Sequence, residues 1–543
     1  MNFNYDEFYN HVPVNQHDLS QHMQARHASI ANLCRGRVLD LGCGTGNLAD
    51  YYFGPYTGYD ISKIAIEKAK QVRRKDAEFA QVDILKHAKN LAQRYDTIVM
   101  AEVLEHFDND SNLFSNITSW AKSNTRLIFT CPLGDRVPDP SHVREITYPM
   151  LRKKLKSWGH VKFYNWPGDK FQILCTCDMG QKNQNSLGLV MIVKDEELGL
   201  EHAIKSALEI SDHITIAIDN ATKDKTAEIA KLYADEIKYF DWQDDFSQAR
   251  NFAHKDLKTK WLLFLDGHEY IFKKDNLEKM LKSAADGLLC SIELENGFVF
   301  QNPRLYKNGF QFEGKVHEKQ NLKNTLYYPD FVIKHNRLGA QSKNAIIARN
   351  AQRDDMVPRL MQKELEQNPK NIRALFHLGL YWQSKGQFKK AIKTYNKYLR
   401  YSKNKQERWF IRFHKALCLM SQNKSFRAFW AINLADDEMP KRWETQKLKG
   451  LIFTYKKQFA KALPFFVDSF SNNTEETLYR PWAKSDAGTW NLIGECLFQL
   501  KNYEKASIAF DRACETAKNE KQKDFFKKRG DLMKQILVGQ TAK

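Results

Sequence analysis

Short apolar runs, each followed by glycine or by polar and acidic residues, recur through the first two thirds of the chain. Apolar runs of this length, bounded by turn residues, are typical of buried strands. Because acidic and polar residues follow several of the runs, we predict two α/β sheets whose carboxyl edges bind ligands. The predicted strands are Val38–Leu41, Tyr56–Tyr59, Tyr95–Met100, Leu187–Val193, Ile214–Ile218 and Trp261–Leu265.

The turn after the first run, Gly42-Cys43-Gly44-Thr45-Gly46, is the most informative stretch. Its glycines permit positive φ, let a ligand approach the backbone and let a helix pack closely on the strand. Asp60 follows Asp40 at about the 20-residue spacing at which an acid meets ribose hydroxyls. Asp40 would repel a pyrophosphate at this turn. The pattern therefore predicts a cofactor with a ribose and a cationic end.

Residues 36 to about 175 resemble a class I S-adenosylmethionine-dependent methyltransferase, through Val38–Gly46, Asp60, Gln81-Val82-Asp83-Ile84 and Tyr95–Met100 in the family's order. The resemblance implies a Rossmann-like domain over residues 1–177 with S-adenosylmethionine as cofactor. The residues that it implies for cofactor binding are Asp40, Gly42, Gly44, Gly46, Asp60, Asp83 and Ile84.

Acidic and histidine residues follow the run Tyr95–Met100. In a helical turn, Glu102, Glu105 and His106 would share a face, and His142 would complete a site of two glutamates and two histidines. This set resembles metal-assisted O-methyltransferases, including those acting on ubiquinone precursors and on the 2′-hydroxyl of small RNA. The resemblance implies a metal that lowers the pKa of the acceptor hydroxyl. The simpler alternative, favoured from sequence, is an acceptor pocket without metal. Either reading predicts an oxygen acceptor and gives Glu102 a catalytic place.

The polar stretch 178–186 lacks apolar periodicity and is predicted to be a linker. Beyond it, the order of strands and polar turns over roughly residues 187–340 resembles a family 2 glycosyltransferase of the GT-A, nucleotide-diphosphosugar type, in the branch joined to helical repeats. The matching segments include Trp242–Asn251 and Gly314–Glu318. The resemblance implies an α/β domain over residues 187–345 and a nucleotide sugar as donor. The implied donor contacts are Lys194, Glu196, Asp219 and, at the diphosphate, Arg250.

The segment Asp266-Gly267-His268-Glu269 departs from the Asp-x-Asp that this family usually has. Asp266 and His268 stand two residues apart and can share one ion that stabilises the departing diphosphate, with His317 completing the shell. Histidine suits Mn²⁺ better than Mg²⁺, so Mn²⁺ (or Mg²⁺) is predicted. The alternative is that His268 only hydrogen-bonds and the metal is lost. Glu318 and Asp245 are both candidates for the base that takes the acceptor's proton, and the sequence does not choose between them.

Residues 346–543 predict an all-α solenoid. Leu378-Gly379, Gly450 and Ile493-Gly494 each precede a small residue and an aromatic residue at the spacing of tetratricopeptide helix pairs, and Phe410–Ile432 fits a fourth, weaker copy. Such arrays present a concave surface. It would guide an acceptor chain or mediate self-association or other protein binding.

Composition narrows the partners and the compartment. The net charge of +19 suits nucleic acid, anionic lipid or phosphorylated sugars. Much of the excess is lysine on helical repeats, and no nucleic-acid-binding signature is present, so nucleic acid is not favoured. The nine cysteines lack paired C-x-x-C modules. Because no apolar run approaches about 18 residues and no signal peptide is evident, we expect a cytoplasmic protein without a membrane span.

These features together predict a multidomain, bifunctional enzyme. It would transfer a sugar from a nucleotide donor and O-methylate a glycan or its precursor, with the repeats holding a glycan or glycoconjugate acceptor. One alternative is glycosylation and methylation of nucleic-acid bases of a phage kind. Another is a repeat scaffold in which one catalytic domain has decayed.

Overall fold

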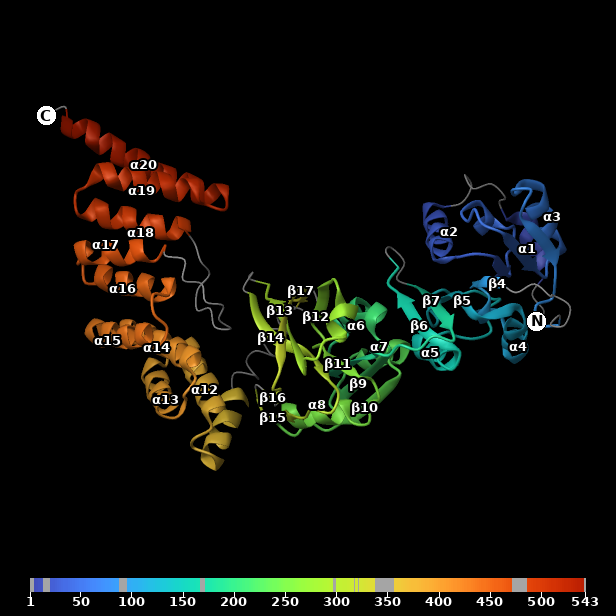
Figure 1. Cartoon of the computed structure of the whole chain (residues 1–543), viewed down its shortest axis with the longest axis horizontal. Helices are drawn as coiled ribbons and strands as arrows, with labels where there is room; N and C mark the ends of the chain where they lie inside the picture. Colours follow the sequence, from blue (N-terminus) through green and yellow to red (C-terminus); the bar gives the residue numbers. More distant parts are fainter. Residues whose placement is uncertain are drawn as a thin grey trace. The chain divides into compact units, whose positions relative to one another are not determined.

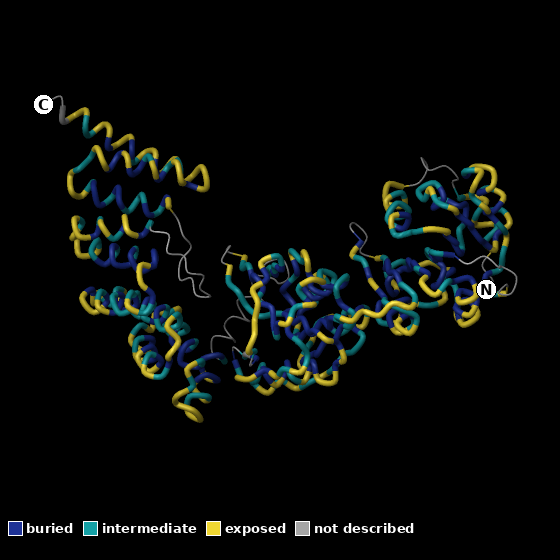
Figure 2. Tube along the Cα trace, viewed as in Figure 1, coloured by how far each residue is buried: buried dark blue, intermediate teal, exposed yellow. Residues whose placement is uncertain are grey.

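The computed structural model describes residues 4–12, 20–86, 95–166, 171–295, 299–316, 318–320, 322–336, 356–470 and 486–541. These residues divide into two compact units. The first contains two large sheets and consists of residues 1–313 and 319–346; the second is helical and consists of 314–318 and 347–543 (Figure 1). Buried residues are concentrated in the strands of both sheets (Figure 2). Among the described helices, none combines the length and apolar character needed to cross a bilayer.

The amino-terminal sheet has seven strands in the order β3-β2-β1-β4-β5-β7-β6. Strands β1 to β5 are parallel, and β7 runs antiparallel to β5 and β6. The strand order reverses between β1 and β4, which creates a topological switch point at their carboxyl ends. The strands are β1 Val38–Leu41, β2 Tyr56–Asp60, β3 Glu78–Gln81, β4 Tyr95–Ala101, β5 Ala121–Pro132, β6 Gly159–Tyr164 and β7 Gln172–Met179. The helices are α1 Tyr5–His11, α2 Gln21–Leu33, α3 Lys63–Val72, α4 Ser111–Trp120 and α5 Tyr148–Leu155, with 3₁₀ turns η2 Asn47–Asp50 and η3 Leu104–His106.

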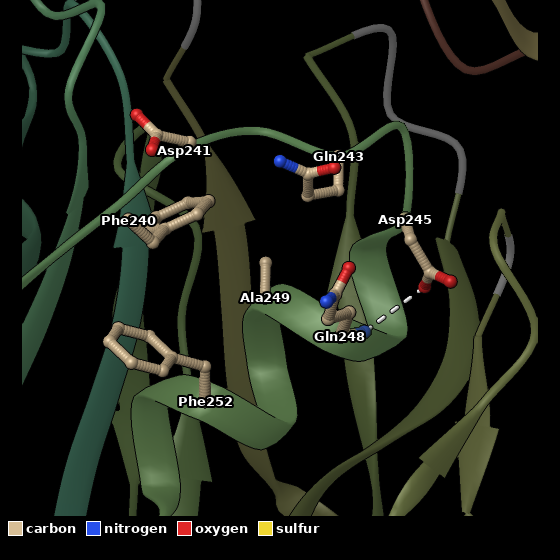
Figure 3. A pocket seen from close by; sticks show the side chains of 7 residues that line it. All are labelled: Phe240, Asp241, Gln243, Asp245, Gln248, Ala249 and Phe252. Atoms are coloured by element: carbon tan, nitrogen blue, oxygen red, sulfur yellow. Dashed lines mark hydrogen bonds between the residues drawn. The ribbon is translucent and has the colours of Figure 1, made fainter.

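The second sheet has eight strands in the order β10-β9-β8-β11-β14-β13-β17-β12. Strands β8 to β11 are parallel and mostly buried. Helix α8 packs on β8 and β9, and its Phe252 lies near Phe240 of β10 (Figure 3). The strands are β8 Leu187–Val193, β9 His213–Asp219, β10 Glu236–Phe240, β11 Trp261–Phe264, β12 Glu269–Lys274, β13 Gly287–Glu293, β14 Val299–Lys307 and β17 Thr325–His335, with the short pair β15 Phe312–Glu313 and β16 Lys319–Gln320. The helices are α6 Leu200–Ala207, η4 Leu208–Ile210, α7 Thr226–Tyr233, α8 Phe246–His254 and α9 Leu277–Leu281.

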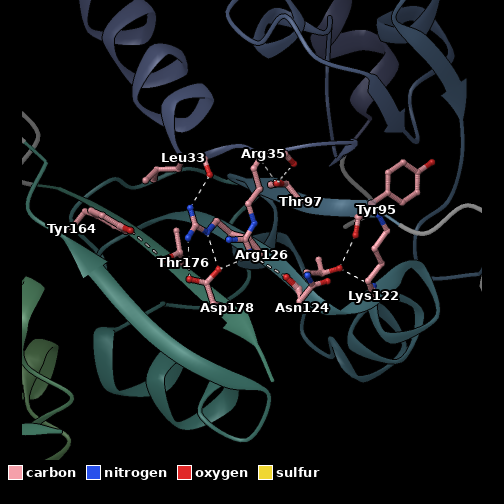
Figure 4. Close-up of polar contacts among 11 residues, drawn as sticks. Leu33, Arg35, Tyr95, Thr97, Lys122, Asn124, Arg126, Tyr164, Thr176 and Asp178 are labelled. Atoms are coloured by element: carbon pink, nitrogen blue, oxygen red, sulfur yellow. Dashed lines mark hydrogen bonds and ion pairs between the residues drawn. The ribbon is translucent and has the colours of Figure 1, made fainter. Parts of the chain in front are cut away.

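The boundary between the two sheets differs from the predicted linker. Asp178 lies within β7, where it accepts hydrogen bonds from Arg126 at 2.8 and 3.0 Å and from Arg35 at 3.2 Å (Figure 4). Its polarity therefore serves an ion pair on the sheet, and β7 continues to Met179. The predicted linker begins two residues too early.

The two sheets of the first unit share one buried apolar cluster. Tyr148 at the start of α5 stacks on Tyr233 at the end of α7, with ring centroids 5.0 Å apart. Leu133 and Ile146 from the first sheet region belong to the same cluster as Leu200 and Ala230 from α6 and α7. The contact between the sheets is therefore a continuous core.

The second unit is a stack of helix pairs, as predicted. In three pairs a glycine faces an aromatic ring sixteen residues later: Gly379 faces Tyr395, Gly450 faces Phe466, and Gly494 faces Phe510. A Cβ on these glycines would lie 2.4, 2.5 and 2.6 Å from the rings, so only glycine fits. Residues 356–367 are helical. The helices that follow are α12 Ile372–Ser384, α13 Phe388–Tyr401, α14 Lys405–Met420, α15 Ser425–Glu438, α16 Trp443–Tyr455, α17 Phe459–Asp468, α18 Asp486–Gln499, α19 Tyr503–Glu515 and α20 Glu520–Thr541.

The fourth predicted copy uses a different pair of residues at the same spacing. Ala416 on α14 and Ile432 on α15 belong to one buried cluster. An alanine fits here because isoleucine is smaller than an aromatic ring.

Candidate functional site

The glycine-rich turn has the backbone conformation that its sequence requires. Gly42, Gly44 and Gly46 have φ of 73°, 53° and 74°. The Tyr59 carbonyl accepts hydrogen bonds from the amides of Gly42 at 2.8 Å and Cys43 at 3.0 Å, which joins the turn to the end of β2. The turn therefore lies at the switch point between β1 and β4.

Two buried carboxylates lie beside the turn. Tyr56 donates its hydroxyl proton to Asp40, and burial raises the pKa of Asp40 to about 7. Asp60 accepts hydrogen bonds from the amides of Gly44 and Ser62, each at 2.8 Å. Burial raises the pKa of Asp60, and these amides oppose that rise. A cationic ligand would favour the ionised form of both acids.

The other predicted cofactor residues follow β3. The amide of Val82 donates to the Asp60 carbonyl at 2.9 Å, which places this segment beside β2. Asp83 accepts from the Leu85 amide at 3.0 Å, and the side chain of Ile84 is buried. The predicted cofactor residues therefore lie near or just after the carboxyl ends of the adjacent strands β1, β2 and β3.

Helix α1 covers this region, and sequence reasoning missed it. A Cβ on Gly44 would lie 2.8 Å from the Tyr9 hydroxyl. Asp6 accepts hydrogen bonds from the Ser62 hydroxyl and the Ile64 amide, and Lys68 donates to the Tyr9 carbonyl at 2.7 Å. The only sequence signal was the aromatic spacing of residues 5, 8 and 9 in a polar segment. The helix closes over the glycine turn.

Three of the four predicted metal ligands of the amino-terminal domain come together. One ligand atom each from Glu105, His106 and His142 lies within 4.8 Å of the others. The prediction that Glu102 shares a helical face with this cluster is wrong. Its φ of 58° is not helical, and the residues after it form a 3₁₀ turn. Its carboxylate is instead paired with Arg26 and accepts hydrogen bonds from Thr130 and Gln172.

The histidine rings of this cluster are oriented for binding a cation. Nδ1 of His106 lies 3.1 Å from the Ser141 carbonyl, and Nδ1 of His142 lies 3.2 Å from the Val137 carbonyl. Because a carbonyl only accepts, each Nδ1 carries the proton and each Nε2 keeps its lone pair. Such second contacts orient the histidines of metal sites.

The carboxylate of the cluster lacks a donor. Glu105 is 1% exposed, and within the described part of the chain neither of its side-chain oxygens has a hydrogen-bond partner. Burial, followed by the charge of Glu102, raises its pKa to about 8. Burial lowers the pKa of His106. An unpaired buried carboxylate is unfavourable, and a divalent cation would offset this penalty. Two nitrogens and one oxygen fit such an ion and leave coordination positions open.

In the second sheet, the predicted donor loops are joined to each other. The Glu196 amide donates to Thr226 Oγ1 at 2.8 Å, and Lys194 pairs with Asp219 at 3.3 Å. The Lys223 amide donates to Asp195 at 2.7 Å. The polar turns after β8 and β9 therefore form one edge.

The turn after β11 lies against the same edge. A Cβ on Gly267 would lie only 2.7 Å from Cγ of the buried Glu196 side chain. Arg250 on α8 pairs with Asp266 at 3.1 Å. Burial acts to raise the pKa of Asp266, but the positive charges of Arg250, Arg304 and His268 hold it well below its usual range. A cation at Asp266 would have to share this carboxylate with Arg250.

A buried network behind Asp266 was missed from sequence. Glu269 pairs with Arg304 at 2.5 Å and with His335 at 3.1 Å, and it accepts from the Asp266 amide at 3.0 Å. The rings of His268 and His335 meet edge to face, with centroids 5.1 Å apart. Arg304 and His335 come from β14 and β17, which carry no motif. Only the fold brings them to this turn.

The remaining predicted residues have different surroundings. Asp245 caps α8 by accepting from the Gln248 amide at 3.0 Å. Glu318 belongs to the second unit, where its carbonyl accepts from Arg373 at 3.5 Å. His317 lies outside the described residues. Asp245 also borders a pocket of about 130 Å³ (Figure 3), lined by Phe240, Asp241, Gln243, Asp245, Gln248, Ala249 and Phe252.

Family models match the chain in three consecutive parts. A methyltransferase domain matches residues 16–167, and glycosyl transferase family 2 matches residues 189–351. Tetratricopeptide repeats match residues 372–405 and 487–520. The chain joins a methyltransferase domain, a family 2 glycosyltransferase domain and tetratricopeptide repeats. The seven-stranded sheet is the methyltransferase domain, and the eight-stranded sheet is the glycosyltransferase domain.

Individual proteins resemble parts of the chain. The SPbeta prophage-derived glycosyltransferase SunS of Bacillus subtilis is 27% identical over 278 residues, which cover 46% of this chain and 63% of SunS. A TPR repeat-containing protein of Synechococcus elongatus is 36% identical over 83 residues, covering 15% of this chain and 20% of that protein. The crystal structure of MamA covers 32% of this chain and 95% of its own, with a TM-score of 0.27 and 16% identity. The chain thus spans less than two thirds of SunS.

Proposed function

We propose that the protein is a bifunctional enzyme that transfers a sugar from a nucleotide-sugar donor to an acceptor and O-methylates a glycan or its precursor with S-adenosylmethionine. The observation that carries this proposal is the presence of two separate sites at the carboxyl edges of two different sheets. The site in the first sheet has a glycine turn beside the carboxylates of Asp40 and Asp60. The site in the second sheet has two hydrogen-bonded loops beside Arg250 and Asp266. The name of SunS supports the glycosyltransferase half.

In the methyltransferase domain, the glycine turn and Asp60 would bind the nucleoside end of S-adenosylmethionine. The negative potential of Asp40 and Asp60 favours the cationic amino-acid end. Glu105, His106 and His142 would hold a divalent ion, which when bound lowers the pKa of the acceptor hydroxyl. The contacts of Nδ1 with the carbonyls of Ser141 and Val137 would leave Nε2 of each histidine to bind the ion. The buried setting of Glu105 excludes water from that side.

In the glycosyltransferase domain, Lys194, Glu196 and Asp219 would bind the nucleoside and Arg250 the diphosphate. Asp266, His268 and His317 would hold Mn²⁺ or Mg²⁺, which when bound neutralises charge on the leaving nucleoside diphosphate. Arg250 pairs with Asp266 at 3.1 Å, which supports a role for its guanidinium beside the metal and the diphosphate. The base that accepts the acceptor's proton is Glu318 or Asp245. Asp245 lies in the same unit as Asp266 and borders the pocket beside α8, so Asp245→Asn is the first variant to test, followed by Glu318→Gln.

The repeats would hold the acceptor. Tetratricopeptide arrays present a surface for peptides or polymers. If the acceptor is a glycan or glycoconjugate carried on a protein, the repeats would bind the protein and the transferase would act on the glycan.

Ligand-induced stabilisation tests the proposal. A ligand at 100 times its Kd adds roughly 2.7 kcal/mol to the stability of its binding state. We expect S-adenosylhomocysteine to stabilise the protein without metal and a nucleotide sugar to stabilise it with Mn²⁺. Asp60→Asn should remove only the first shift, and Asp266→Asn only the second. Loss of both shifts in either variant would overturn the assignment of two sites.

Turnover distinguishes an active transferase from a scaffold. The wild-type chain should slowly hydrolyse its nucleotide sugar in the presence of Mn²⁺ without acceptor, and Asp266→Asn should not. A chain that binds the donor but never releases nucleoside diphosphate, with or without acceptor extracts, would contradict glycosyl transfer.

A further inference from the structure

A polar cluster joins the methyltransferase and glycosyltransferase domains near both proposed sites. Arg136 of the methyltransferase domain makes two contacts with Glu201 of α6, at 2.5 and 3.2 Å. The Tyr233 hydroxyl, at the end of α7, donates to the same carboxylate at 2.6 Å, and Lys205 lies 3.1 Å from it. Burial acts to raise the pKa of Glu201, but these donors lower it to about 2. The carboxylate is therefore a strongly held, ionised anchor.

Arg136 belongs to the loop that carries His142. The loop is closed at its base, where Leu133 pairs with Ile146 and the Gly134 amide donates to the Ile146 carbonyl at 2.8 Å. Gly134 has φ of 60°, and a Cβ there would lie 3.0 Å from Leu232 of α7. The base of the loop therefore rests on the glycosyltransferase domain.

The far side of the same loop contacts the proposed metal ligands. Val137, next to Arg136, supplies the carbonyl that orients His142, and Ser141 supplies the carbonyl that orients His106. The Val143 amide donates to the Glu105 carbonyl at 2.9 Å. Arg136 is therefore joined to His142 through the adjacent Val137, and to His106 and Glu105 through Ser141 and Val143 of the same loop.

We propose that Arg136 is a positioning residue through which Glu201 and Tyr233 of the glycosyltransferase domain hold residues 135–145 in the shape that brings His142 to Glu105 and His106. The metal part of this inference rests on the proposed function; the positioning of the loop does not. The methyltransferase site is then complete only when the glycosyltransferase domain is docked. Helices α6 and α7 begin at the donor loops, so the same two helices support both sites.

Hydrogen exchange of the full-length chain tests the inference without any ligand. In the native protein the His142 amide donates to the Asp139 carbonyl at 3.0 Å and the Val143 amide to Glu105. We expect Glu201→Ala to raise the exchange rates of both amides at least tenfold. Arg136→Lys, which keeps the charge but loses the bidentate geometry, should give a smaller increase.

The control is Glu209→Ala, a carboxylate that also bridges the domains by accepting from the Asn165 amide at 3.4 Å but lies away from the loop. It should leave both amides protected. Unchanged exchange at His142 and Val143 in Glu201→Ala and Arg136→Lys would overturn the inference.

Mn²⁺ titration separates this inference from the proposed function. Glu201→Ala should weaken Mn²⁺ binding at the methyltransferase site about tenfold or more, as loss of outer contacts does at other metal sites. Affinity for S-adenosylhomocysteine should change little, because the hydrogen bonds described for the glycine turn join it to Tyr59 and Asp60 at the end of β2. If the wild-type methyltransferase site binds no Mn²⁺ while loop exchange still rises in Glu201→Ala, the positioning role stands and the metal assignment fails.

Discussion

Gly267→Ala should weaken nucleotide-sugar binding through a single side chain. Gly267 is buried, and a Cβ there would lie 2.7 Å from Cγ of Glu196 and 2.9 Å from its Cβ and Cδ. Gly267 is not among the residues with positive φ, so alanine is compatible with the backbone. Since carbon atoms prefer separations of about 3.5–4.0 Å, Glu196 must move by about 1 Å.

The size of the effect follows from the proposed role of Glu196. A hydrogen bond to a charged group contributes about 1.5–3 kcal/mol, and tenfold in Kd corresponds to about 1.4 kcal/mol. Displacement of the Glu196 carboxylate should therefore raise the Kd for the donor nucleotide about 10- to 100-fold.

Isothermal titration with UDP and GDP, each with Mn²⁺, measures this loss. The matched background is Glu196→Gly, which also removes the Glu196 Cβ that would lie 2.9 Å from the new Cβ. In that background Gly267→Ala should have almost no further effect, because the two changes act on one contact. If Gly267→Ala weakens binding equally in both backgrounds, the clash with Glu196 is not its cause. If neither change affects binding, Glu196 does not contact the donor.

Three further predictions concern other parts of the chain. Gly450→Ala should destabilise the repeats by about 1–3 kcal/mol, because its Cβ would meet the Phe466 ring, and adding Phe466→Ile should restore most of the loss in denaturant unfolding. The raised pKa of Glu105, about 8 against 4.5, means that the folded state holds this proton more tightly. The protonated Glu105 side chain therefore contributes to folding stability below pH 4.5, and this contribution, up to about 5 kcal/mol, is lost as the pH rises to 8. Glu105→Gln should make the melting temperature less dependent on pH over this range, whereas Glu145→Gln, at an exposed position, should not. Gly44→Ala should abolish stabilisation by S-adenosylhomocysteine, because alanine is strained at a φ of 53° and its Cβ would lie 2.8 Å from the Tyr9 hydroxyl; retained binding would show that the turn does not bind the cofactor.

Most of the fold was predictable because it follows from local patterns. Buried parallel strands read as continuous apolar runs, and the glycines of the turn at 42–46 are needed for positive φ. The repeats were recognisable because the glycine and aromatic positions recur at a fixed spacing, for example in Gly494 and Phe510.

The parts that were missed depend on contacts between residues distant in sequence. Arg304 and His335 flank Glu269 only because β14 and β17 join the second sheet. Helical spacing predicted that Glu102 and Glu105 share one face. Glu102 instead has a φ of 58°, which is not helical, so its side chain does not join that face. Asp178 was assigned to a linker because an ion pair on a strand and a solvated loop use the same residue type.

The apolar cluster that runs from α5 to α7 affects how this protein can be divided. A fragment ending near residue 186 would leave Tyr148 without the ring of Tyr233 and Arg152 without Asp235. The newly exposed surface would include the Tyr148 ring and other apolar side chains of the shared cluster, which favour aggregation. Expression of the methyltransferase half alone should therefore fail unless those positions are redesigned, even though its sequence reads as a separate module.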